Sequence, residues 1–119
     1  MNKSVPEHYR DVARFVAEAF VGNVSIRQAW DQDETSTIGV LTAIDSPSVD
    51  LNSYSTIGFC DTQIHDYEEE LSYRAELAMV AQQRFEKARN ILATAAFHVI
   101  NSNWSCHRLA IYPDVVDMY

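Results

Sequence analysis

The strongest constraint on the fold of this chain is a change in the spacing of its apolar residues. Over residues 84–100 they recur at the 3.6-residue period of a helix, whereas between residues 24 and 80 they mostly alternate with polar residues, as in β-strands. This order predicts an α+β fold, in which an N-terminal and a C-terminal helix pack on an antiparallel sheet.

The first helix is predicted over residues 5–21. Ser4 can serve as its N-cap, because Glu7 follows three residues later as in a capping box and Pro6 suits the first turn. Gly22 is a natural end for the helix. The apolar stripe that repeats at helical spacing consists of Val12, Phe15, Val16, Ala19 and Phe20.

Four strands are predicted, over residues 24–30, 36–45, 54–60 and 72–80. The first two are expected to form a hairpin around a polar turn. The segment 72–80 has a competing helical interpretation, because it is rich in residues that favour helices. The clearest helix, over 84–100, carries a stripe of Phe85, Ala88, Leu92, Ala95, Ala96 and Val99.

The chain has 119 residues, the size of a single domain spanning 1–119, and 47% of them are apolar, which is enough to form a core. No apolar run approaches the roughly 20 residues that cross a bilayer, and the N-terminus does not resemble a signal peptide. The sequence therefore predicts a cytoplasmic protein. Cys60 and Cys106 fit that compartment as free thiols.

The formal net charge of −8 restricts the classes of partner. Nucleic acids and anionic membranes carry dense negative charge and would repel an acidic chain, so neither is an expected partner. A basic protein is favoured instead, because opposite fields speed encounter. The alternative is that the acidity only keeps the protein soluble.

No cofactor, metal or catalytic residue is predicted. Cys60, His65, Cys106 and His107 are the donors of a conceivable zinc site, but their spacings do not match those of known sites. A nucleophilic Cys106 with His65 and Asp61 has no supporting local motif.

Two kinds of residue are candidates for protein binding. Acidic clusters are most often solvated loops, but one of them could dock a basic partner. Tryptophan and tyrosine often anchor interfaces and also occur in cores. The candidate protein-binding residues are Asp66, Glu68, Glu69, Glu70, Trp104 and Tyr112.

Several segments resemble the suppressor-of-fused family. They are DSP at 45–47, SYSTIG at 53–58, YRAEL at 73–77, INSNW at 100–104 and PDVVDMY at 113–119. Their order and spacing carry the resemblance, which covers most of the chain after the first helix.

The resemblance implies a non-enzymatic protein-binding domain. Bacterial members of the family look like immunity proteins of polymorphic toxin systems, whereas the animal members bind a transcription-factor peptide as an added strand. A single compact domain fits the bacterial kind, with a basic toxin as the partner. The alternatives are a regulatory adaptor that binds a peptide as an added strand, and a small cysteine- or carboxylate-dependent enzyme.

The family pattern continues beyond the point where this chain stops, so the chain is expected to lack the family's C-terminal portion. Residues 113–119 include Val115, Val116, Met118 and Tyr119, which are apolar. We therefore expect this segment to be buried, either against its own core or in a homodimer.

Overall fold

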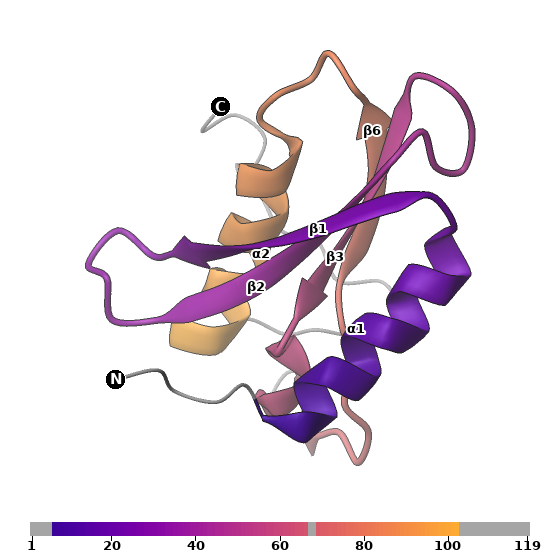
Figure 1. The fold of residues 1–119 in the computed structure, drawn as a ribbon. Coiled ribbons are helices and arrows are strands. Elements are labelled where there is room, and N and C mark those ends of the chain that lie inside the picture. Colours follow the sequence, from indigo (N-terminus) through magenta and orange to yellow (C-terminus); the bar gives the residue numbers. More distant parts are fainter. Residues whose placement is uncertain (1–5, 67–68, 103–119) are drawn as a thin grey trace, which may run out of the picture.

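A computed structural model describes residues 6–66 and 69–102 of the chain (Figure 1). In chain order the elements are α1 (Glu7–Phe20), β1 (Asn23–Trp30), β2 (Thr37–Ile44), β3 (Leu51–Ile57), the 3₁₀ turn η1 (Phe59–Asp61), β4 (His65–Asp66), β5 (Glu69–Glu70), β6 (Ala78–Gln82) and α2 (Ala88–Ser102).

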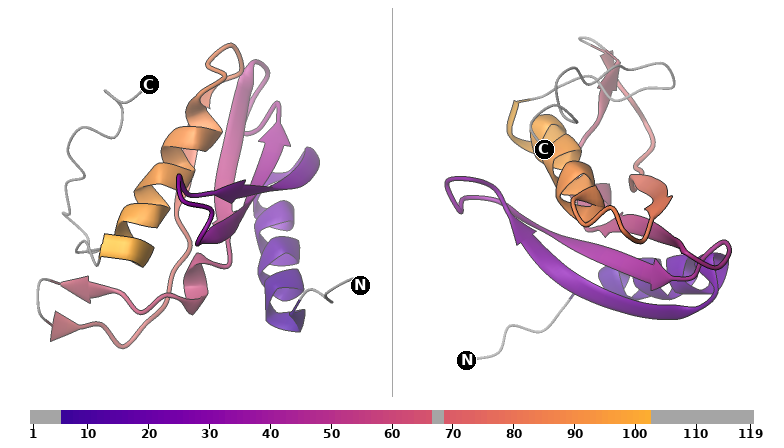
Figure 2. Two further views of the ribbon diagram at one scale, coloured as in Figure 1. Left: turned by 90° about the vertical axis from the view of Figure 1, so that its left-hand side faces the viewer. Right: turned by 90° about the horizontal axis from the view of Figure 1, so that it is seen from above.

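The main sheet has four antiparallel strands in the order β1-β2-β3-β6. β1 and β6 are therefore its edge strands. β4 and β5 form a separate two-stranded hairpin. The two helices cover opposite faces of the sheet, which makes three layers, as Figure 2 shows. The predicted α+β architecture with two helices on an antiparallel sheet is confirmed.

The hydrophobic core lies between the sheet and α2. Ile38, Val40 and Tyr54 point from the sheet into this layer, and they belong to one cluster of buried residues with α2. The helix contributes Ala88, Leu92, Ala93, Ala96 and Val99. The sheet-facing surface of α2 is therefore built largely from small side chains.

The opposite face of the sheet is covered by α1, which contacts β2 and β3. The small side chains of Ala43, Ser53 and Ser55 are buried on this face beneath the helix. No residue of α1 itself is fully buried, and Phe15 in its predicted apolar stripe is exposed. The α1 layer consequently buries less side-chain surface of its helix than the α2 layer.

The ends of α1 differ in part from the prediction. The helix begins at Glu7 with Pro6 at the N-cap position and no side-chain cap, and Ser4 lies outside the described residues. The expected end at Gly22 is close, because Val21 leaves the helix with a positive φ of 58°. A Cβ on Gly22 would lie 2.9 Å from the Ile44 carbonyl oxygen, so a glycine is needed there.

Two strand predictions were wrong in their bounds. The third strand was expected over 54–60 but runs Leu51–Ile57. It starts earlier because Leu51 already pairs with β6, and Asn52 pairs with both β2 and β6. The fourth was expected over 72–80 but begins only at Ala78. Residues 72–77 form neither strand nor helix, so the competing helical interpretation was also wrong. At their end, Leu77 accepts from the Thr56 backbone N–H and Glu76 binds η1.

The second helix was predicted over 84–100 and runs Ala88–Ser102. Phe85 precedes it in a turn and is exposed, so this residue was wrongly assigned to the buried stripe. Within the described ranges, neither helix has the length and apolar character that a bilayer span requires. The predicted burial of residues 113–119 falls outside the described part of the chain.

Candidate functional site

The structure places the predicted protein-binding residues only in part. Glu69 and Glu70 are exposed on β5, and Asp66 belongs to the paired strand β4. Glu68, Trp104 and Tyr112 lie outside the described residues. The acidic segment is thus a short hairpin separate from the main sheet, and its role in binding stays a prediction.

A strip of apolar side chains lies exposed on the edge strand β1. Val24, Ile26 and Trp30 are 43%, 50% and 57% exposed. The register with β2 puts all three on the sheet face that carries α1, but α1 covers mainly the two central strands. We call these three residues the β1 strip. Sequence alternation predicted the strand, but it gave no sign that this face would remain uncovered.

A groove of about 430 Å³ continues the β1 strip toward α1. Its wall on the helix side includes Tyr9 and Ala13, and its floor includes Ile26, Gly39 and Ile57. Gly39 has no side chain that would fill the groove, and a Cβ there would lie 3.3 Å from the Ile57 carbonyl oxygen. The strip and the groove together form a largely apolar surface.

The other end of the β1 strip meets an acidic loop. Asp31 accepts hydrogen bonds from the backbone N–H of Thr35 at 2.7 Å and of Ser36 at 3.1 Å. The Asn101 side chain of α2 donates to Asp31 at 3.0 Å and accepts from the Ser36 hydroxyl at 2.7 Å. These bonds tie the β1–β2 loop to α2.

Hydrogen bonding also favours the ionised form of Asp31. The Ser36 backbone N–H, followed by the Thr35 hydroxyl, lowers the pKa of the Asp31 carboxyl. A hollow of about 710 Å³ lies between this loop and α2, and Trp30, Asp31, Asp33 and Phe97 are among its lining residues. An aromatic side chain and carboxylates thus border the same concave surface.

A second carboxylate organises η1. Glu76 accepts hydrogen bonds from the backbone N–H groups of Gly58, Phe59 and Cys60 at 3.0–3.1 Å, and from the Thr56 hydroxyl at 2.8 Å. Gly58 is left-handed, with φ 106°. The turn can therefore aim three successive N–H groups at one anion.

Side chains of α1 and η1 meet beside this turn. His8 Nε2 lies 2.9 Å from one Asp61 carboxylate oxygen, and the Tyr9 hydroxyl donates to the other. The donor atoms of His8, Cys60 and Asp61 all lie within 4.8 Å of one another. No sequence motif signals this group, because His8 and Asp61 are 53 positions apart.

The pKa values of this group follow from its hydrogen bonds and burial. The bond to Asp61 raises the pKa of Tyr9 to about 12, and the same bond lowers the pKa of the Asp61 carboxyl. Burial, followed by hydrogen bonding to Glu76, raises the pKa of the Cys60 thiol to about 12. At neutral pH this thiol is protonated, which is unfavourable for a nucleophile.

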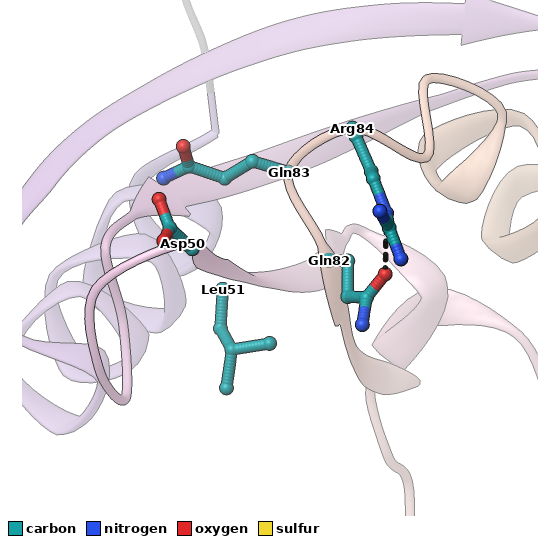
Figure 3. A pocket seen from close by; sticks show the side chains of 5 residues that line it. All are labelled: Asp50, Leu51, Gln82, Gln83 and Arg84. Atoms are coloured by element: carbon teal, nitrogen blue, oxygen red, sulfur yellow. Dashed lines mark hydrogen bonds between the residues drawn. The ribbon is translucent and has the colours of Figure 1, made fainter.

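A third hollow, of about 520 Å³, lies where the β2–β3 loop meets the turn before α2 (Figure 3). Arg84 donates to the Gln82 side chain at 2.8 Å, and the Gln83 backbone N–H donates to the Asp50 carbonyl at 3.0 Å. These polar groups bind one another, so the hollow is a junction between two loops.

Comparison with known proteins gives one informative similarity. The chain is 32% identical over 115 residues to a Bacillus subtilis (strain 168) protein named immunity protein YqcF. The alignment covers 97% of this chain. The chain spans 60% of the length of that relative. No protein-family model and no solved structure matches the chain.

Proposed function

We propose that this chain is an immunity protein that neutralises a bacterial toxin by binding it, without catalysis. The observation that carries the proposal is the 32% identity to a named immunity protein over nearly the whole chain. The resemblance of five segments to suppressor-of-fused proteins supports a domain of that type, whose bacterial members look like immunity proteins. Such a protein would act in the cytoplasm, where it would meet the toxin.

The β1 strip and the acidic loop beside it form the proposed toxin-binding surface. A protein interface typically combines a central apolar or aromatic anchor with a polar rim. Trp30 supplies the anchor, and Val24 and Ile26 extend the apolar area toward the groove beside α1. Asp31 and Asp33 border the hollow next to Trp30 and supply the acidic rim.

The proposed toxin is basic. The net charge of −8 favours a positively charged partner, because complementary fields accelerate encounter and exclude wrong partners. Glu69 and Glu70, which are exposed on β5, would add to this steering together with Asp66 and Glu68. Trp104 and Tyr112 remain proposed contact residues as well.

An adaptor that binds a peptide as an added strand is the second candidate. The observation that favours it is that β1 is an edge strand of eight residues, whose outer side is not paired with any described strand. Backbone groups there would pair with an extended peptide, and the β1 strip would accept its apolar side chains.

A binding titration with matched variants tests the proposal. The test uses the purified toxin that the neighbouring gene encodes. Trp30→Ser should weaken its binding about 30-fold, as expected for a hot-spot aromatic residue. Tyr73→Ser is the matched control, because Tyr73 is an aromatic residue that is 55% exposed and lies outside the proposed surface. Its affinity should stay near that of the wild type.

Two outcomes would oppose the proposed surface or the proposed function. Equal affinity of the Trp30→Ser variant and the wild-type protein would show that the β1 strip is not the contact surface. Absence of binding by the folded wild-type protein would refute toxin binding itself. Preference for a short extended peptide over the toxin would favour the adaptor.

A further inference from the structure

We infer that His8, Cys60 and Asp61 form a binding site for a divalent transition-metal ion such as Zn²⁺. An imidazole nitrogen, a sulfur and a carboxylate oxygen converge there within 4.8 Å of one another. The site joins the first turn of α1 to η1, two segments that the chain brings together from distant positions. This revises the expectation from sequence spacing that no metal binds.

The donor set is of the kind that zinc takes in proteins. Zn²⁺ binds His nitrogen, Cys sulfur and Asp oxygen at 2.0–2.3 Å, which places the ligand atoms of a tetrahedral site roughly 3.3–3.8 Å apart. The longest separation among the three atoms therefore needs to shorten by about 1.0–1.5 Å, and the 2.9 Å between His8 Nε2 and the Asp61 oxygen needs to lengthen by about 0.4 Å. His8 is 55% exposed and can make this adjustment by side-chain rotation.

Hydrogen bonds position the two ligands on η1, Cys60 and Asp61, in the absence of a metal. The Glu76 carboxylate fixes the backbone of Cys60 through its N–H at 3.1 Å. The Tyr9 hydroxyl donates to one Asp61 oxygen and leaves the other facing His8 Nε2 at 2.9 Å. Hydrogen bonds of this kind to metal ligands orient them and strengthen binding.

Charge at the site favours a cation. Two carboxylates lie beside Cys60: Glu76 accepts the hydrogen bond of its backbone N–H at 3.1 Å, and an Asp61 oxygen lies within 4.8 Å of its sulfur. A thiol that coordinates a divalent ion loses its proton, here to solvent, and binds as the thiolate. Three protein ligands leave a fourth position, which faces solvent because both His8 and Asp61 are about half exposed.

Binding at this site would fasten α1 to the rest of the fold. α1 has no fully buried residue, so its attachment depends on few contacts. A ligand that binds only the folded state stabilises it. A saturating concentration of Zn²⁺ should therefore raise the melting temperature of the wild-type protein by about 5 °C.

Titration with Co²⁺ tests the inference, since Co²⁺ replaces Zn²⁺ and reports its ligands by absorption. We expect one Co²⁺ per chain, with a thiolate-to-cobalt charge-transfer band that added Zn²⁺ removes. Cys60→Ser should abolish the band, and Cys106→Ser, the matched thiol control, should keep it. His8→Gln and Asp61→Asn should each weaken Co²⁺ binding at least tenfold, and His8→Gln should lose the thermal shift with Zn²⁺.

Three results would overturn the inference. They are the absence of a saturable thiolate band, loss of the band in Cys106→Ser, and unchanged affinity in either His8→Gln or Asp61→Asn. Circular dichroism establishes that each variant is folded. If Cys60→Ser does not fold, the two other ligand variants decide, because their side chains are exposed.

Discussion

At the scale of single residues, carboxylates hold together the parts of the chain that lack regular pairing. Glu76 binds three backbone N–H groups of η1, and Asp31 binds the N–H groups that close the β1–β2 loop. Both residues are acceptors in charge-assisted hydrogen bonds, which are stronger than neutral ones. Some of the acidic side chains therefore stabilise the folded state.

Replacement of Glu76 tests this view directly. Glu76→Gln keeps the size of the side chain but removes its charge and one of its two acceptor oxygens. The expected loss is about 2 kcal/mol in the free energy of unfolding, measured by urea denaturation. Glu86→Gln, at an exposed position before α2, is the control and should change stability little. A change below about 0.5 kcal/mol in Glu76→Gln would contradict the role of this carboxylate.

Asp31 should make stability depend on pH in acid. Its folded-state pKa lies below its ordinary value of 3.8, so its contribution is present above that value and disappears as the pH falls through the lower folded-state pKa. The urea midpoint of the wild-type protein should therefore exceed that of Asp31→Asn at about pH 6, and the two should converge toward pH 2. A difference that persists in strong acid would indicate a cause other than ionisation.

At the scale of elements, the sequence predicted which segments pair better than it predicted where they end. Alternation placed β1 and β2 within a residue or two of their observed bounds. It missed the start of β3 at Leu51, because Leu51 and Asn52 follow a loop and gain strand structure through pairing with neighbouring strands, Leu51 with β6 and Asn52 with both β2 and β6. Periodicity also cannot tell which face of an edge strand is covered, so the β1 strip was not predicted.

The candidate sites show the same limit of sequence information. The His8–Asp61 contact depends on how α1 crosses the sheet, and no local spacing encodes that crossing. The sequence showed that the segment with Glu69 and Glu70 is acidic, but it did not predict that this segment forms a hairpin. Local patterns thus predict elements, whereas sites are formed by contacts between elements.

The two helices should differ in local stability. α2 contributes six buried residues to the structure and α1 none, so α1 can open at lower cost. Amide hydrogen exchange should therefore be faster along α1 than along the central part of α2. Equal protection of both helices would show that α1 is held more firmly than its burial indicates.

At the scale of the whole molecule, the proposed toxin binding depends on the net charge and on one uncovered surface. A toxin that is steered by the net charge of −8 should associate more slowly as salt rises, because exposed charges are screened over roughly 8 Å at physiological ionic strength. We expect the association rate constant to fall about tenfold between low and high salt. Glu69→Gln with Glu70→Gln should lower the rate at low salt, and a rate independent of salt would exclude steering.

The expected homodimer stays a prediction. It was based on residues 113–119, which lie outside the described part of the chain. Light scattering at micromolar concentration measures the state of association. If a dimer is found, the toxin should still reach the β1 strip in it, since that surface is proposed for the toxin.

Growth protection of toxin-expressing cells is the most direct test of the proposed immunity function. Cells that express the toxin encoded by the neighbouring gene should die without this protein and survive when the wild-type chain is co-expressed. The Trp30→Ser variant should protect less at the same expression level, and Tyr73→Ser should protect like the wild type. Death of cells that contain abundant, folded wild-type protein together with its neighbouring toxin would contradict the proposed immunity function.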